Sequence, residues 1–412
     1  MSSSRTIAWM IWLIASIFYA YQYILRVMPN IMMNDLIAQF NFDAATFGQF
    51  SGIYYIGYTL LHLPIGIMLD RYGPKKVMPI CMLLTVVGTM PIIFAEYWVY
   101  PIIGRALVGI GSAAAILGVF KIVRLTFSEQ RFTRMLSFSV TIGLIGAIYG
   151  GAPVNYMCSA MGYKTVAGIF AALGVTLSII TYMLVPNIKR QETTSVFTGI
   201  RSVLSNTKVM AICIFAGLMV GPLEGFADVW GTEFLKQAYG FDSGVAASLP
   251  SMMYIGMCFG GPILSMLSEK SQSHLGVITG TGVIMAICFV LMILGALGSV
   301  PVMTAVFIIV GICCAYQIIA IYKASTYVEE NEVGLTTAMA NMIIMAFGYM
   351  FHSVIGQVIK VFGGVQSASA FSTGLAVIPI ALIIASIGFA IIILQELVQT
   401  PAKAVSLNEI GG

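Results

Sequence analysis

Apolar runs of about 20 residues recur along the whole chain, and they restrict its fold more than any other feature. A helix needs about 20 predominantly apolar residues to cross the hydrocarbon core of a bilayer. Scanning with this length predicts an all-α membrane protein with twelve transmembrane helices. These helices are expected at 7–34, 45–69, 76–95, 98–122, 135–158, 163–186, 209–234, 245–268, 274–296, 300–324, 337–360 and 371–396.

The composition agrees with a lipid bilayer as the solvent and argues against several functions. Hydrophobic residues make up 59% of the 412 positions and charged residues 9%, against about 25% charged in an average soluble domain. A net charge of +4 without a basic tract gives no reason to expect nucleic-acid binding. The seven cysteines have no metal-ligand spacing, so neither a metal nor another cofactor is expected. No nucleotide-binding or hydrolase motif occurs, so neither an enzyme nor an ATP-driven pump is expected.

One long polar and basic segment, Asn187–Lys208, interrupts the apolar runs at the middle of the chain. We interpret 187–208 as a cytoplasmic linker that joins two bundles of six helices. The N-terminal bundle is predicted at 1–186, and the C-terminal bundle at 209–412, with a short cytoplasmic tail. The first apolar run is longer than the core of a signal peptide, so it is interpreted as the first membrane span.

The distribution of basic residues predicts the orientation. With the N-terminus in the cytoplasm, fifteen of the 20 lysines and arginines lie on the cytoplasmic side. Only Lys164, Lys236 and Lys360 lie in outer loops, and Arg26 and Arg105 lie within spans. Cytoplasmic loops of membrane proteins carry an excess of lysine and arginine. We therefore expect both termini to be cytoplasmic, in a multi-pass protein of a bacterial inner membrane.

The two halves carry matching landmarks, which indicates an internal repeat. Asp70 and Glu269 both end a span, each followed by a basic residue, and they are 199 positions apart. Lys121 and Lys323 each follow a glycine by twelve residues and are 202 positions apart. Repeats of six helices are related by an axis along the membrane normal, with the substrate site near the midplane between them.

The loop after the second predicted span carries a specific motif. It reads Gly66-Ile-Met-Leu-Asp70-Arg71-Tyr-Gly73-Pro-Lys75-Lys76. This segment resembles the G-x-x-x-D-R-x-G-x-K/R motif of the major facilitator superfamily, and it matches at every key position. The resemblance implies that Asp70 and Arg71 belong to a cytoplasmic latch and not to the substrate site. Gly66 is expected to allow a close approach of helices.

Two further segments resemble motifs of this superfamily. Gly104-Arg105-Ala-Leu-Val-Gly109-Ile-Gly111 is similar to an R-x-x-x-G-x-G motif whose arginine is linked to proton coupling. A role for Arg105 in coupling and a snorkelling, interfacial Arg105 are equally compatible with its position. The fifth span has Ala147 where the antiporter motif has proline, which argues against a proton-driven drug antiporter.

Arg26 is the clearest charge inside a predicted span, where insertion of an arginine costs about 2.5–3.5 kcal/mol. Gln22 lies one helical turn before it, and Tyr23 lies close to the same face. The stretch resembles the first helix of organic-anion porters of the superfamily, in which an arginine binds the substrate carboxylate. Those porters often have aspartate before the arginine, and this chain has Leu25. Any proton-coupling acid must therefore lie elsewhere or be absent.

Glu224 and Asp228 lie one turn apart in the seventh predicted span, after Pro222. Adding the repeat offset of 199 to Arg26 gives position 225, so Glu224 should lie at nearly the same depth. We hypothesise that Arg26 approaches Glu224 or Asp228 when the outer gate closes, in competition with an anionic substrate or a proton. The alternative is that both acids simply face an outer vestibule.

Weaker candidates for a polar cavity are Tyr54, Tyr58, Tyr316, Gln317 and Asn341. For each of them, helix packing explains the residue equally well. The sequence leaves open whether Lys121, Lys323 and His352 line the cavity, and the two lysines fit better as anchors at the inner face.

These observations predict a secondary active transporter that moves a small organic anion, such as a carboxylate metabolite or a siderophore, by alternating access. We expect proton coupling and a monomer. An exporter of amphipathic drugs or lipids is the first alternative, and it predicts a cavity without a central cation. A non-transporting membrane sensor is the second, and the tail of about 16 residues after the last span argues against it. The sequence does not identify the substrate or the direction of transport.

Overall fold

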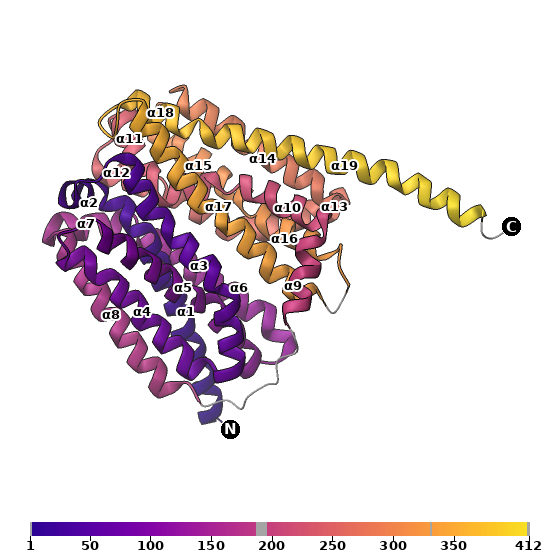
Figure 1. Cartoon of the computed structure of the whole chain (residues 1–412), viewed down its shortest axis with the longest axis horizontal. Helices are drawn as coiled ribbons and strands as arrows, with labels where there is room; N and C mark the ends of the chain where they lie inside the picture. The colour runs from indigo at the N-terminus through magenta and orange to yellow at the C-terminus, as the bar shows by residue number, and fades with distance from the viewer. Residues whose placement is uncertain (1, 187–195, 330–331, 410–412) are drawn as a thin grey trace.

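The computed structural model describes residues 2–186, 196–329 and 332–409, and every regular element within these ranges is helical. Figure 1 shows two helical bundles, one built from each half of the chain. The predicted class, an all-α membrane protein of two bundles, is confirmed. The predicted domain boundaries stay predictions, and residues 187–195 of the predicted linker lie outside the described residues.

The described part of the first half forms eight helices. α2 and α7 are short, and they follow α1 and α6 at the same end of the bundle (Figure 1). The helices are α1 (Ser2–Ile31), α2 (Met33–Phe40), α3 (Ala44–Tyr72), α4 (Pro74–Phe94), α5 (Val99–Thr126), α6 (Glu129–Tyr149), α7 (Ala152–Met161) and α8 (Tyr163–Leu184).

The second half contains several spans that are broken into consecutive helices. Its elements are α9 (Val196–Ser205), α10 (Thr207–Leu218), η1 (Gly221–Trp230), α11 (Gly231–Tyr239), α12 (Ser243–Ser248), α13 (Ser251–Ser271), α14 (His274–Ile293), α15 (Val300–Cys314), α16 (Tyr316–Ser325), α17 (Val333–Val361), α18 (Ala368–Leu375) and α19 (Val377–Glu409). η1 is a π-helix of ten residues in the middle of the seventh predicted span. Helices of this type are rare and often mark functional sites.

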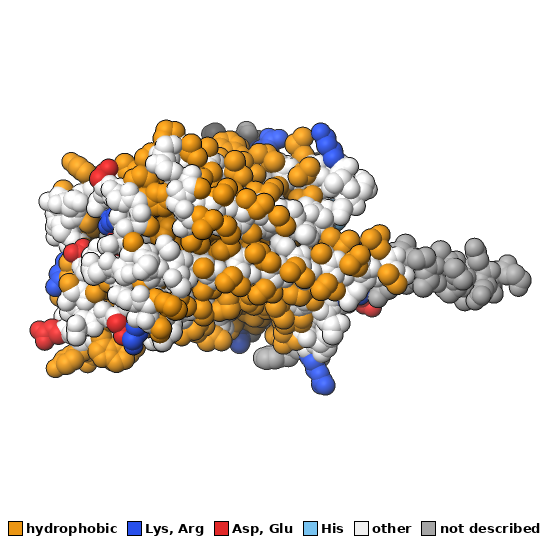
Figure 2. All heavy atoms as spheres, turned by 90° about the horizontal axis from the view of Figure 1, so that it is seen from above, with side chains coloured by type: hydrophobic (Ala, Val, Ile, Leu, Met, Phe, Trp, Pro, Cys, Tyr) orange, Lys and Arg blue, Asp and Glu red, His pale blue; other side chains and the backbone are white. Residues whose placement is uncertain are grey.

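The described residues contain eleven helical segments that are long and apolar enough to cross a bilayer. α6 and α7, bent by 40° relative to each other, make a twelfth if they count as one span. Figure 2 shows a broad apolar belt around the visible face, with most charged side chains toward the two ends. This arrangement matches a protein that is surrounded by lipid at its middle.

The two bundles meet mainly near one end of the molecule. Contacts between the bundles pair α3 with α17, α6 with α13, α7 with α12, and α1 with both η1 and α11. Figure 1 shows that the bundles converge where α2, α11 and α18 lie and diverge toward the end that carries α9 and the N-terminus. We call these the α2–α11 end and the α9 end.

Glycines allow the helices of the two bundles to touch near the α2–α11 end. A Cβ atom on Gly48 of α3 would overlap the carbonyl oxygen of His352 on α17. A Cβ atom on Gly356 of α17 would lie 2.5 Å from the carbonyl oxygen of Ala44. Glycine is therefore required here because the two backbones are in direct contact.

The motif glycines of α3 behave differently from each other. Gly73 ends α3 with a φ of +81°, a conformation that favours glycine. At Gly66, by contrast, an added Cβ atom would make only an ordinary contact, 3.8 Å from Leu117 Cδ1. The expected close helix approach at Gly66 is therefore absent from this conformation.

Candidate functional site

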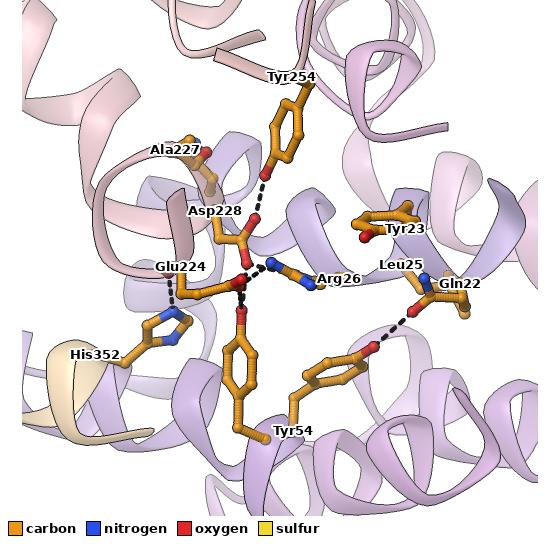
Figure 3. Close-up of polar contacts among 12 residues, drawn as sticks. Gln22, Tyr23, Leu25, Arg26, Tyr54, Glu224, Ala227, Asp228, Tyr254 and His352 are labelled. Atoms are coloured by element: carbon orange, nitrogen blue, oxygen red, sulfur yellow. Dashed lines mark hydrogen bonds and ion pairs between the residues drawn. The ribbon is translucent and has the colours of Figure 1, made fainter. Parts of the chain in front are cut away.

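A cluster of five buried side chains joins the two bundles, and we call it the gate cluster: Arg26, Tyr55, Glu224, Asp228 and Tyr254. Figure 3 shows Arg26 pointing toward Glu224 and Asp228, with Tyr254 beside Asp228. Arg26 Nε donates to Asp228 Oδ2 at 2.5 Å, and Arg26 Nη2 forms an ion pair with Glu224 Oε2. The Tyr55 hydroxyl donates to both carboxylates, and the Tyr254 hydroxyl donates to Asp228. The hypothesised approach of Arg26 to the two acids is thus present in this conformation.

Burial makes the pairing in this cluster obligatory. Arg26 is 6% exposed, Glu224 1% and Asp228 0%, so the two acids do not face an open vestibule. A buried charge is costly unless it is paired and hydrogen-bonded. Here the guanidinium meets both acids, and the aromatic rings of Tyr23 and Tyr55 lie 5.1 and 5.3 Å from its Cζ atom.

Arg105 braces the backbone of α1 at the position of Arg26. Its Nη1 donates to the carbonyl oxygen of Leu25 at 2.5 Å, and its Nη2 donates to that of Arg26 at 2.7 Å. Pro29 lies inside α1 and has no N–H, so the Leu25 carbonyl lacks its usual helical partner. Arg105 is 4% exposed and packs on the ring of Tyr54. The interfacial, snorkelling alternative for Arg105 is therefore wrong.

Four of the predicted substrate-binding residues line the same region. Gln22 Oε1 accepts a hydrogen bond from the Tyr54 hydroxyl at 2.7 Å. Tyr23 packs on the Arg26 guanidinium, and Tyr58 stacks on Tyr54 with ring centroids 6.1 Å apart. These side chains lead from Arg26 along α1 and α3 toward the α9 end.

The other three predicted substrate-binding residues are less closely connected to Arg26. The Tyr316 hydroxyl donates to the carbonyl oxygen of Ala216 at 2.6 Å, a contact within the C-terminal bundle. Gln317 is buried, and its Nε2 makes no hydrogen bond to the described residues. Asn341 is half-buried on α17 and interacts with Tyr58 on α3. Packing accounts for Tyr316, whereas the roles of Gln317 and Asn341 stay predictions.

The motif residues near the α9 end lie apart from the gate cluster. Lys121 Nζ binds Asp70 Oδ1 at 2.7 Å, and exposed Arg71 packs over the ring of Tyr72. In the other bundle Lys323 pairs with Glu396 of α19 at 3.0 Å. The repeat would have predicted Glu269 as that partner, so the two halves differ here.

Further contacts between α1–α2 and η1–α11 extend the gate cluster toward the α2–α11 end. Asn30 Nδ2 donates to the Ala227 carbonyl at 3.2 Å, and Asn34 Nδ2 donates to Glu233 Oε2 at 3.1 Å. Near them, Lys360 of α17 pairs with Asp43, the N-cap of α3, at 2.9 Å. The bundles are thus fastened in successive layers.

Sequence reasoning missed Asn30, Asn34 and Tyr254, although two signals could have found them. Asn30 and Asn34 continue the four-residue spacing of Gln22 and Arg26, which predicts one polar stripe along the first span. Tyr254 lies 199 positions after Tyr55, the repeat offset itself. The donation of His352 Nε2 to the Glu224 carbonyl at 2.5 Å had no signal in the sequence.

A sequence model described as the Major Facilitator Superfamily matches residues 11–353 of this chain. The chain belongs to the Major Facilitator Superfamily. The motifs around Asp70 and Arg105 fit this membership. A superfamily member with this many apolar helices is a multi-pass membrane transporter of small molecules and not an enzyme.

Several known proteins resemble the chain along much of its length. A Bacillus subtilis protein described as a probable galactarate/D-glucarate transporter is 22% identical over 65% of this chain and 66% of its own length. The chain thus spans just under two thirds of that relative. The hexuronate transporter of Bacillus subtilis is 21% identical over 86% of this chain and 87% of its own length. An inward-facing bacterial homologue of the lysosomal transporter Spinster superimposes with a TM-score of 0.73 at 15% identity, covering 93% of this chain and 96% of its own.

Proposed function

We propose that this superfamily member is a secondary active transporter of a small organic anion, which it moves by alternating access. The observation that carries the proposal is Arg26, a buried guanidinium held between the bundles by Glu224 and Asp228. A cation in this position suits a substrate carboxylate, because guanidinium and carboxylate groups form paired, charge-assisted hydrogen bonds. An exporter of neutral or cationic amphiphiles would gain nothing from it.

The side chains beside Arg26 favour an anion that also carries hydroxyl groups. Gln22, Tyr23, Tyr54 and Tyr58 provide hydrogen-bonding groups and aromatic faces along α1 and α3 near Arg26. The names of the two Bacillus subtilis relatives refer to sugar acids, namely galactarate, D-glucarate and hexuronate. Sugar acids combine a carboxylate with several hydroxyl groups, so we infer that the substrate belongs to this chemical class.

The charges around Arg26 support a proposal of proton coupling. Arg26 and Arg105 contribute two buried positive charges, and Glu224 and Asp228 contribute two negative charges. When a substrate carboxylate takes the guanidinium, one acid is displaced into a buried site without its partner. That acid then favours its protonated form, since an unpaired buried carboxylate is costly. We infer that one proton enters with each carboxylate bound.

We also propose that Asp70, Arg71 and Arg105 act in gating. The protein works as a monomer, with one domain at 1–186 and the other at 209–412. The α2–α11 end faces outward from a bacterial inner membrane, and the α9 end with both termini faces the cytoplasm. This orientation agrees with the excess of basic residues expected on the cytoplasmic side.

The test is uptake of radiolabelled D-glucuronate, galactarate, glucose and tetraphenylphosphonium into proteoliposomes, with and without an inward proton gradient. We expect uptake of an acid that the gradient accelerates, and none of glucose or the cation. Arg26→Gln should reduce this uptake by roughly 100-fold, the effect of removing a buried charge from its partners. Arg124→Gln, which alters an exposed arginine on α5, should leave it unchanged. Uptake of the cation alone, or normal uptake by Arg26→Gln, would overturn the proposal.

A further inference from the structure

The π-helix η1 receives hydrogen bonds from side chains of two other helices, one from each bundle. His352 Nε2 on α17 lies 2.5 Å from the Glu224 carbonyl oxygen. Asn30 Nδ2 on α1 donates to the Ala227 carbonyl oxygen at 3.2 Å. A carbonyl oxygen only accepts, so His352 must carry its hydrogen on Nε2 here. Figure 3 shows the His352 ring pointing at the backbone of Glu224, away from the carboxylates.

The helical register of η1 determines where the two acids point. Side chains four residues apart are offset by about 40° in an α-helix and by about 30° in the opposite sense in a π-helix, a change of about 70°. Both carboxylates of η1 reach the same guanidinium, and the Tyr55 hydroxyl bridges them. A change to α-helical register would therefore withdraw at least one acid from Arg26.

We propose that His352 and Asn30 are positioning residues that hold η1 in its π-helical register and so aim Glu224 and Asp228 at Arg26. His352 belongs to the same bundle as η1, and it supports the register whether or not the bundles meet. Asn30 belongs to the other bundle, so its support exists only when the α2–α11 end is closed. The register of η1 thereby depends on closure. This inference rests on the proposed function for its transport consequences but not for its structural ones.

The surroundings of His352 support a specific role and not a general packing one. Its Nδ1 is buried and makes no hydrogen bond to the described residues. Its ring lies edge-on to Tyr55 at 5.3 Å, next to the hydroxyl that bridges the two acids. Gly48 and Gly52 of α3 pack directly against the His352 backbone and Cβ atom. The imidazole is thus fixed between α3 and η1, with one hydrogen bond that a glutamine amide can reproduce.

The experiment compares His352→Gln, which keeps a donor, with His352→Leu, which has a similar volume and none. The readout is ¹⁹F NMR of the protein labelled with 5-fluorotryptophan. The chain has four tryptophans, so the spectrum should contain few resonances. Trp230 ends η1 and packs on Phe47 of the other bundle at 5.6 Å, so its resonance reports closure. Trp230→Phe assigns that resonance.

We expect His352→Leu to shift the closed-to-open ratio by on the order of tenfold, the effect of one buried hydrogen bond and a carbonyl left without it. His352→Gln should restore the wild-type ratio, and Asn30→Leu should act in the same direction as His352→Leu. In D-glucuronate uptake, His352→Leu should lower the maximal rate more than it changes KM. An unchanged Trp230 resonance in His352→Leu, or equal effects of leucine and glutamine, would overturn the inference. Failure of D-glucuronate uptake in the wild type would overturn only the proposed function, because the NMR comparison needs no substrate.

Discussion

The charge balance of the gate cluster can be tested through the stability of the protein without any substrate. Replacing Arg26 with glutamine leaves Glu224 and Asp228 buried, with exposures of 1% and 0%. Two tyrosine hydroxyls remain as donors, but neither carries a positive charge. Removing one partner from a buried ion pair costs about 3–5 kcal/mol. The closed conformation of the variant should therefore lose about two to four orders of magnitude in relative population.

The assay is thermal unfolding in detergent at pH 8. We expect Arg26→Gln to unfold at a lower temperature than the wild type, because its two acids are left buried without a positive partner. Combining it with Glu224→Gln and Asp228→Asn should restore much of the stability, because all three groups are then uncharged.

Comparing Arg26→Gln, the variant with both acids neutralised, and their combination separates the effect of the ion pair from the effect of lost packing. Glu224→Gln with Asp228→Asn alone should be destabilising, since Arg26 then lacks an acid. The interaction term between the arginine and the acids should exceed about 1 kcal/mol, as expected for residues in one network. Exposed Arg124→Gln provides the control and should change stability by less than about 0.5 kcal/mol. Two results would refute this role of the ion pair: an Arg26→Gln variant as stable as this control at pH 8, or a neutral triple variant as unstable as Arg26→Gln.

Three further outcomes test the layers around the gate cluster. Gly48→Ala should open the α3–α17 contact and redshift tryptophan emission, because its Cβ atom meets an α17 carbonyl, whereas Gly280→Ala, with nothing within 4 Å, should not. Arg105→Gln should lower stability by about 1–3 kcal/mol in chemical denaturation, because two α1 carbonyls lose their charged donor. Partial burial acts to raise the pKa of Asp43, but hydrogen bonds from Lys360 and the α3 backbone outweigh it and lower the pKa below 3.8. The stability from this pair should thus be complete above pH 3.8 and decline below it. Lys360→Met should reduce that decline in an acid-unfolding titration, because only the hydrogen bond from the α3 backbone then remains.

Much of the architecture could be predicted from the sequence, because spans and repeats are set by hydrophobicity and length. The offset of 199 placed Arg26 within one residue of the depth of Glu224, and the two side chains meet. The sequence could not predict how each span would break. The ten-residue π-helix depends on donors that approach from α1 and α17, and a local pattern contains no information on such contacts.

Arg105 and Trp230 show the same limit. Arg105 looks interfacial when its position is counted along one helix, yet it is buried by the α1 backbone that Pro29 leaves open. Trp230 lies near the end of a predicted span, where tryptophan often faces the membrane interface, but it is fully buried between Phe47 and Phe371. In both cases the burial of the side chain depends on a neighbouring helix that is distant in the sequence.

The two acids of η1 have a consequence for the driving force of transport. If each substrate carboxylate is matched by one proton, a monocarboxylate moves with one proton and a dicarboxylate with two, one for each acid. No net charge then crosses the bilayer in either case. A full elementary charge crossing 100 mV would contribute about 2.3 kcal/mol, and this transporter would forgo that contribution. Accumulation would follow the pH difference between the two compartments, and the electrical potential of the membrane would neither help nor oppose it.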